Sequence, residues 1–405
     1  MPLMSVWKSN RDEVLKMSIE QTVSIAGDGN LRDNAESSQE LRQFLSVVRS
    51  EHLFACARHC LESSFNKSGL VLQDIVNEFG RRLDFDVENG LYQGRRNAIG
   101  FDGIWRIKGE NDLVVEVKTT DYVTISLDKL ANYRDRLAEE NQVRRDASLL
   151  IIVGREDTGA LEAQVRGSRY AWDMRLISVE GLIKLVQVKE KSDDPNTVRQ
   201  IRQLLRPLEY TKIDKIIDVI FTAAVDVENQ RVTEEAAPQD QEESPEPYRQ
   251  DRTDPDLLNA KRQQAVDAFA AQKGKELVKR SRPLFWSPDK EPRVCCAVSK
   301  RYEAKGGYQP YWYAYHPSWD AFLAEGKDAF FILSCMDRDD AFAIPFSWME
   351  KNKKNMNISE RGERSYWHVP VTTLDNGHLA INLSKIQTKA ALEPFRFQFK
   401  KAAKA

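Results

Sequence analysis

The sequence predicts an α/β (α+β) fold, in which a mixed sheet is flanked by helices, followed by a separate strand-rich α+β or small-barrel domain. Short apolar runs typical of buried strands alternate with amphipathic segments through the first half of the chain. An acidic segment then interrupts this pattern, and many short apolar runs follow it. With 405 residues and 41% hydrophobic content, the chain is long enough to form two domains with sizeable cores.

The first half of the chain alternates between helical and extended patterns. Helices are expected where apolar residues recur at helical spacing, at residues 38–62, 70–83, 127–137, 159–166, 180–188 and 200–223. Strands are expected at short apolar or alternating runs, at residues 99–107, 112–120, 149–153 and 174–179. This alternation favours a mixed sheet that is covered by helices.

Residues 226–256 are predicted to form a disordered linker. The segment carries 11 acidic and 3 basic residues and almost no large apolar side chains. It therefore cannot bury enough surface to offset the entropy that ordering would cost. The predicted boundaries are residues 1–225 for the first domain, 226–256 for the linker and 257–405 for the second domain.

The second domain is basic, since residues 261–405 hold 25 Lys and Arg against 16 Asp and Glu. A helix is predicted at residues 256–280. Its cations suit contacts with a phosphate backbone, although a solvated helix face would look similar: Lys261, Arg262, Lys273, Lys275, Lys279 and Arg280. Strands are expected at 293–299, 311–315, 329–335, 341–346, 367–371 and 379–383, with helices at 319–324 and 348–354.

An aromatic run at residues 311–316 is the second domain's candidate for contacts with nucleobases. In a strand, Tyr311, Tyr313 and Tyr315 lie on one face, and Trp312 lies on the other. One of the two faces belongs to the core. The other is a candidate surface for stacking against bases, although core packing explains most aromatic residues in a domain of this size.

The five cysteines form an odd and sparse set, which argues against a disulfide framework. Cys56, His59 and Cys60 share one face of the predicted helix, but the spacing and fourth ligand of a zinc site are missing. Core cysteines are the preferred interpretation. The sequence contains no apolar run long enough to span a membrane and begins without an apolar signal segment, so a cytoplasmic protein is expected.

The candidate active site consists of Asp102 in the run IGFDGIW and of Glu116 and Lys118 in the run DLVVEVKTT. Side chains alternate along a strand, so Glu116 and Lys118 share one face. A hairpin turn at residues 109–112 would bring Asp102 beside Glu116. Two neighbouring carboxylates repel each other unless a cation lies between them, and oxygen ligands of this kind are those that Mg²⁺ prefers. A chance ion pair on a solvated strand is the alternative, but the surrounding apolar residues favour a buried strand.

These residues resemble the PD-(D/E)XK nuclease superfamily, whose members have a restriction-endonuclease-like fold. The resemblance covers roughly residues 36–190 and depends on Asp102 followed by the Glu-Val-Lys run at 116–118. It implies that Asp102, Glu116 and the carbonyl of Val117 bind the metal ion. Lys118 would support the reaction by orienting or deprotonating the attacking water, or by neutralising charge on the phosphoryl oxygens. The resemblance also implies a further residue on the first helix, for which Gln73 and Glu78 are both candidates. One departure is that Phe101 precedes Asp102 where the pattern often has Pro.

The resemblance implies a DNA endonuclease that depends on Mg²⁺, with Mn²⁺ as a substitute, and that acts in defence against foreign DNA. Its second domain would recognise the substrate, which includes the case of a modified base. The same site would serve for RNA or branched DNA, and a catalytically silent nucleic-acid-binding or scaffold protein is the alternative of another class. A homodimer and a protein partner that supplies specificity are both left open. Arg155, Arg166 and Arg169 are further candidates for phosphate contacts.

Overall fold

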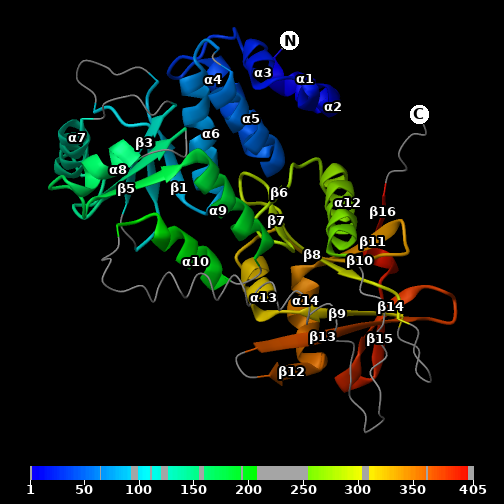
Figure 1. Cartoon of the computed structure of the whole chain (residues 1–405). Coiled ribbons are helices and arrows are strands. Elements are labelled where there is room, and N and C mark those ends of the chain that lie inside the picture. The colour runs from blue at the N-terminus through cyan, green and yellow to red at the C-terminus, as the bar shows by residue number, and fades with distance from the viewer. Residues whose placement is uncertain are drawn as a thin grey trace. The chain divides into compact units, whose positions relative to one another are not determined.

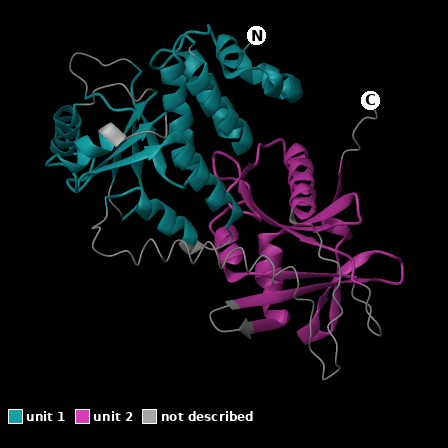
Figure 2. Cartoon of the chain, viewed as in Figure 1, with its two compact units in different colours: residues 1–192, 196–223 teal, residues 193–195, 224–405 magenta. Residues whose placement is uncertain are grey.

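The computed structural model describes residues 2–63, 65–92, 99–109, 112–119, 126–154, 159–192, 195–207, 254–302, 310–361 and 364–399. The chain divides into two compact units (Figure 2), Met1–Ser192 with Asn196–Ala223 and Asp193–Pro195 with Ala224–Ala405. The predicted linker at 226–256 lies outside the described residues up to residue 253. Its last residues lie at the start of helix α12, which begins at Pro255.

A five-stranded mixed sheet forms the centre of the first unit (Figure 1). Its strand order is β1-β2-β3-β4-β5. The strands β1, β2 and β3 pair antiparallel, whereas β3, β4 and β5 run parallel. Their bounds are Asp86–Asn89, Gly103–Arg106, Leu113–Lys118, Ser148–Val153 and Met174–Ser178. The predicted mixed sheet is confirmed, but the strand expected at 99–107 is shorter because the chain bends at Asp102.

Helices cover both faces of this sheet, as the sequence predicts. Helices α4 (Glu36–Val47), α5 (Ser50–Glu62), α6 (Ser68–Arg82) and α9 (Val179–Lys191) contribute to one core, in which Val115 and Ile152 are buried. Helices α7 (Leu127–Glu139) and α8 (Gly159–Arg166) contribute to the other, with Val114 and Ile151. The continuous apolar run of β4 reflects this arrangement, because its successive side chains enter both cores.

The predicted helix at 38–62 is wrong as a single element, because α4 and α5 are separated at Val48 and Arg49. Both residues have extended backbone angles. The guanidinium of Arg82 donates to the carbonyl of Val48 at 2.8 Å and to that of Leu45 at 3.3 Å. These bonds satisfy carbonyls that the end of α4 leaves without helical partners. Upstream, the short helices α1 (Leu3–Ser9), α2 (Arg11–Lys16) and α3 (Ile19–Ser24) complete this part of the unit.

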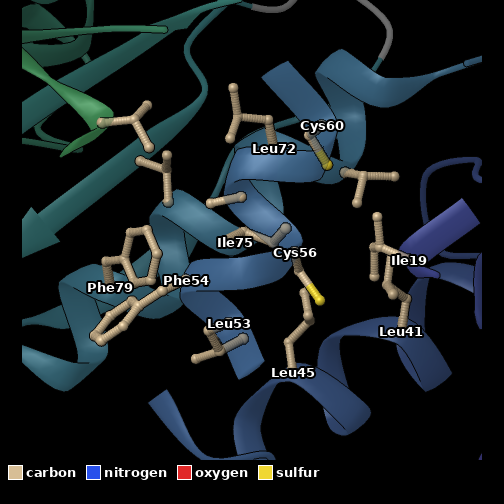
Figure 3. Packing of buried hydrophobic residues seen from close by; sticks show 14 of the residues in the cluster. Ile19, Leu41, Leu45, Leu53, Phe54, Cys56, Cys60, Leu72, Ile75 and Phe79 are labelled. Carbon is tan, nitrogen blue, oxygen red and sulfur yellow. The ribbon is translucent and has the colours of Figure 1, made fainter. Parts of the chain in front are cut away.

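Cys56 and Cys60 belong to the apolar core between these helices. Figure 3 shows both thiols among apolar side chains that include Ile19, Leu45 and Leu72. Burial raises the pKa of the Cys56 thiol to about 12. Within the described residues, no group of three or more His, Cys, Asp or Glu residues is placed to hold a metal ion. The interpretation of Cys56 and Cys60 as core residues is therefore confirmed.

The end of the first unit differs from the prediction in two places. Strand β5 ends at Ser178, because the Ser178 hydroxyl accepts a hydrogen bond from the N–H of Gly181 at 2.9 Å and caps α9. Helix α10 spans Pro195–Leu204 and begins before the helix predicted at 200–223. The part of that prediction from residue 208 onward lies outside the described residues.

The second unit contains two open sheets, so the small-barrel alternative is wrong for the strands that the structure describes. One sheet is mixed and six-stranded, in the order β16-β11-β10-β8-β7-β6, and the other contains β12, β13, β14 and β15, with β9 paired to β13. The bounds from β6 to β16 are Val278–Lys279, Leu284–Trp286, Arg293–Ser299, Tyr311–Tyr315, Ala329–Cys335, Asp340–Pro345, Ile358–Arg361, Arg364–Thr373, Leu379–Leu383, Thr388–Ala391 and Arg396–Gln398.

Helix α12 (Pro255–Lys273) covers one face of the six-stranded sheet through Val266 and Phe269. It ends at Gly274, whose φ of 63° places it in the left-handed region that favours glycine. The prediction of a helix through residue 280 is therefore wrong. Helices α13 (Pro317–Ala324) and α14 (Phe346–Asn352) and three short 3₁₀ turns (Lys353–Asn355, Ser384–Ile386 and Glu393–Phe395) complete the unit.

Candidate active site

The structure brings Asp102, Glu116 and Lys118 together where β2 and β3 meet. Gly103 pairs with Val115, so Asp102 lies one step further along, beside Glu116. The N–H of Asp102 donates to the carbonyl of Val115 at 3.0 Å. On the other strand, the Lys118 ammonium donates to Glu116 Oε1 at 2.5 Å. Two carboxylates and one ammonium therefore share one small region, as expected from the sequence.

The strand β3 places its two charged side chains on one face. Val115 and Val117 pack with the core that contains α6, whereas Val114 belongs to the opposite core. By alternation, Glu116 and Lys118 share the face of Val114, at the end of the strand where burial decreases. Their side chains are 15% and 28% exposed, so the pair is neither fully buried nor freely solvated.

A pocket of about 260 Å³ adjoins these residues. Its wall includes two of the candidate residues, Asp102 and Lys118, together with Gly69, Leu70, Gln73, Tyr92, Val117 and Thr119. The charged groups therefore border a space that a ligand can reach. A solvated hairpin with a chance ion pair would not require such a pocket.

The carboxyl group of Asp102 has an unusual electrostatic environment. Burial and, to a lesser extent, the charge of Glu116 raise its pKa to about 7, against the opposing effects of the Val117 N–H and of Lys118. The Val117 N–H donates to Asp102 Oδ2 at 2.7 Å, which leaves Oδ1 for an ion. Because the neighbouring negative charge contributes to the shift, a cation between Asp102 and Glu116 would favour the ionised form.

The ligand set expected of Mg²⁺ fits this geometry. Mg²⁺ needs few protein ligands because it keeps several waters, so two carboxylates and a carbonyl suffice. The N–H of Val117 faces Asp102, and in an extended strand the N–H and C=O of one residue point to the same neighbouring strand. The carbonyl of Val117 is therefore directed to the side of Asp102. Asp102, Glu116 and Val117 offer three oxygen ligands from adjacent strands.

Helix α6 contributes Gln73, and not Glu78, to the pocket. Gln73 lines the pocket, and its amide Nε2 donates to the carbonyl of Asp102 at 3.1 Å. Glu78 is buried elsewhere, where its carboxylate accepts from Arg82 Nε at 3.0 Å and pairs with Arg81 at 3.4 Å. Of the two candidate residues on α6, only Gln73 lies in the wall of the pocket beside Asp102.

Two residues of this region carry no prediction in the sequence analysis. Asn77 donates from Nδ2 to the carbonyl of Asp102 at 2.8 Å, and it lies one helical turn after Gln73. The spacing of these two amides on one helix is a signal that was present in the sequence. Tyr92 also lines the pocket, and its hydroxyl donates to the carboxylate of Asp74. The guanidinium of Arg42 lies 4.8 Å from the centre of the Tyr92 ring. We find no pattern in the sequence that would have indicated Tyr92.

The arginines proposed for phosphate contacts have different environments. Arg155 lies outside the described residues, and Arg166 is exposed at the end of α8. Arg169 pairs with Asp128 at 2.9 Å, and its guanidinium also lies 4.9 Å from the ring centre of Tyr170. Arg169 is therefore already engaged by groups of the first unit.

The basic helix of the second unit does not present its cations as a free stripe. Arg262 is buried and donates to the carbonyl of Cys296 at 3.0 Å, so it has a structural role. Lys261 donates to the carbonyl of Arg338, and Lys273 and Lys275 pair with Asp328 and Asp289. Arg280 lies over the ring of Trp286, directly after strand β6. The expectation that these residues form one phosphate-binding helix face is not supported.

The aromatic run of β9 is buried on both faces. Tyr311, Tyr313 and Tyr315 belong to the core between the two sheets. Trp312 is only 8% exposed, and its Nε1 donates to His368 Nδ1 at 3.3 Å. The interpretation of one face as core is confirmed, and the expectation of an open stacking face on the other is wrong.

No protein-family model matches the sequence, and no curated protein matches it either. In the part of the chain that the structure describes, no helix has the length and apolar character needed to cross a membrane.

Proposed function

We propose that this protein is a Mg²⁺-dependent endonuclease that hydrolyses phosphodiester bonds of DNA through a restriction-endonuclease-like first unit. The observation that carries this proposal is that Asp102, Glu116 and Lys118 meet on β2 and β3, with Asp102 and Lys118 in the wall of one pocket. Two neighbouring carboxylates, of which Asp102 has a raised pKa, suit a divalent cation, and an adjacent ammonium suits an anionic substrate. A role in defence against foreign DNA follows from the resemblance of these residues to restriction-type nucleases.

The chain's own residues have distinct parts in this reaction. Asp102, Glu116 and the Val117 carbonyl would hold the ion, which would acidify a bound water and polarise the phosphate. Val117 also orients Asp102 through its N–H, which donates to Oδ2 at 2.7 Å. Lys118 would neutralise negative charge that develops on the phosphate oxygens, or orient the attacking water. The pocket beside them supplies room for the substrate backbone.

The reaction is tested with purified full-length protein on supercoiled DNA, single-stranded RNA and a four-way DNA junction. We expect Mg²⁺ or Mn²⁺ to support nicking of supercoiled DNA, and a chelator to abolish it. Cleavage of RNA alone, or of the junction alone, would show that RNA or branched DNA is the substrate instead of ordinary duplex DNA. Binding of DNA without any cleavage under all metal conditions would favour a catalytically silent nucleic-acid-binding protein.

Replacing Lys118 with Met should separate catalysis from ion binding. Cleavage should fall by about 10²–10³-fold, because a charge that faces the developing phosphate charge is lost. The affinity for Mg²⁺ without DNA should instead rise several-fold, because the ammonium that now pairs with Glu116 at 2.5 Å no longer competes with the ion. Calorimetry measures the affinity, and a nicking assay measures the rate.

The exposed Lys16 on α2 offers a matched control, since Lys16→Met removes one cation from the same unit without touching the pocket. It should leave both quantities unchanged. A Lys118→Met variant that cuts DNA at the wild-type rate would contradict the role given to Lys118.

The pH dependence of ion binding follows from the raised pKa of Asp102. The ion binds the ionised carboxylate, so a proton on Asp102 competes with it. Because burial and Glu116 raise this pKa to about 7, the affinity should rise with pH below that value and level off above it. The slope should approach tenfold per pH unit when one proton is displaced, roughly 1.4 kcal/mol. Titrations with Mg²⁺ from about pH 5 to about pH 9 check this, and a flat profile below pH 7 would contradict it.

A further inference from the structure

The backbone at Asp102 is held by more hydrogen bonds than the strand pairing requires. Its carbonyl accepts from the N–H of Gly90 at 3.0 Å, from Gln73 Nε2 at 3.1 Å and from Asn77 Nδ2 at 2.8 Å. Both amide side chains are buried, at 3% and 1% exposure. Placing two polar side chains in the core costs free energy unless their hydrogen bonds are made, so this arrangement calls for an explanation.

The amide of Asn77 has only one orientation that fits its surroundings. Its Oδ1 accepts from the indole N–H of Trp105 at 3.0 Å, which leaves Nδ2 to face the carbonyl of Asp102. Two glycines make room for this contact. A Cβ at Gly103 would lie 2.1 Å from Asn77 Oδ1, and a Cβ at Gly80 would lie 2.6 Å from the ring of Trp105.

These bonds fix the direction of the Asp102 side chain. The N–H of Asp102 donates to Val115 and its carbonyl is held from α6, so the peptide groups on both sides of its Cα are fixed. The direction of the Cα–Cβ bond is then set by the backbone. The Val117 N–H finally anchors Oδ2 at 2.7 Å. A carboxylate beside Glu116 would otherwise turn away from the like charge.

We propose that Gln73 and Asn77 form an amide clamp that positions the Asp102 carboxylate for a divalent ion. This inference rests on the proposed function, because it assigns the two residues to the same ion site. Both act through Asp102 and are positioning residues. Outer residues that orient a metal ligand typically change metal affinity by about 10–100-fold when they are replaced.

The test measures Mn²⁺ affinity of the full chain without DNA, together with thermal unfolding. Gln73→Met removes the donor and keeps the length of the side chain, and Asn77→Leu removes the second donor. Each should weaken Mn²⁺ binding by about 10–100-fold. Gly103→Ala should do the same, because its Cβ displaces Asn77. The exposed Gln39 on α4 supplies the control, and Gln39→Met should bind Mn²⁺ like the wild type.

A fourth variant, Gln73→Glu, separates a clamp from a direct ligand. A carboxylate at position 73 cannot donate to the Asp102 carbonyl, so the clamp requires weaker Mn²⁺ binding. A direct ligand would instead bind the ion more tightly with the added charge, and that result would overturn the inference. Unchanged affinity in folded Gln73→Met would also overturn it, even if Asn77→Leu fails to fold. A wild type that binds Mn²⁺ but cuts no nucleic acid would overturn only the proposed reaction, whereas one that binds no Mn²⁺ would overturn both.

Discussion

The Asp102→Asn variant should lose Mg²⁺-dependent cleavage by at least about 10³-fold and should also be more stable than the wild type without metal. The loss of activity follows from the removal of one anionic ion ligand. The gain in stability follows because Asn has no charge to repel Glu116, while its side-chain oxygen can still accept from the Val117 N–H that now bonds Oδ2 at 2.7 Å. The same carboxylate would therefore support function and weaken the fold.

The size of the stability effect depends on pH. Asp102 has a folded-state pKa raised from 3.8 to about 7, so the folded protein binds this proton more tightly than the unfolded chain. The free energy of unfolding therefore falls as the pH rises from 3.8 to about 7, and the full penalty is present above the folded-state pKa. The advantage of Asp102→Asn should be absent near pH 4 and greatest above pH 7. At pH 8 the melting temperature should rise by roughly 5 °C.

Thermal unfolding of both proteins at pH 4 and pH 8, with a chelator present, measures this difference. The exposed Asp86 on β1 provides a control in the same sheet, and Asp86→Asn should shift the melting temperature by less than about 1 °C. Saturating Mg²⁺ should stabilise the wild type and leave Asp102→Asn unaffected. A lower melting temperature for Asp102→Asn at pH 8 would show that the carboxylate is held by a favourable partner.

The central strands and the covering helices could be predicted from local pattern alone. The runs that became β4, β8, β9, β10 and β14 are short, apolar and bounded by turns, and the bounds of β8, β9, β10 and β14 are those predicted. The helix predicted at 159–166 likewise matches α8. These segments are buried on one or both faces, so burial in the core requires apolar residues at positions that the sequence itself shows.

Elements that depend on distant partners could not be predicted in this way. Strands β6, β7, β12, β15 and β16 have only two to four residues each and are defined by the neighbours with which they pair. At the break between α4 and α5, the carbonyl of Val48 accepts from Arg82, which lies more than 30 residues further along the chain. For the candidate site, the three charged residues could be chosen from their strand pattern. The helical spacing of Asn77 from Gln73 was also present in the sequence, but the orientation of the Asn77 amide depends on its hydrogen bond with Trp105.

Replacing Arg82 with Met should cause the largest loss of stability in the first unit. Arg82 is 4% exposed, and its guanidinium pairs with the buried Glu78 and donates to Ser50 Oγ at 3.1 Å and to the Val48 carbonyl at 2.8 Å. Removing the guanidinium leaves the buried carboxylate of Glu78 without its main partner. It also leaves the carbonyls of Leu45 and Val48, at the end of α4, without this hydrogen-bond donor. Breaking a buried ion pair from one side costs about 3–5 kcal/mol, so the melting temperature should fall by roughly 10 °C.

An exposed ion pair in the same unit gives the matched comparison. Arg58 on α5 pairs with Glu180 on α9 at 2.8 Å, with side chains 46% and 33% exposed, so Arg58→Met should cost only about 0–1 kcal/mol. The double variant Arg82→Met with Glu78→Leu should recover part of the loss, because no buried charge is left unpaired. Urea unfolding of the three variants measures their free energies of unfolding and tests this order of stability. An Arg82→Met variant no less stable than Arg58→Met would mean that the carbonyls of Leu45 and Val48 find other donors, and that the break between the two helices does not depend on this guanidinium.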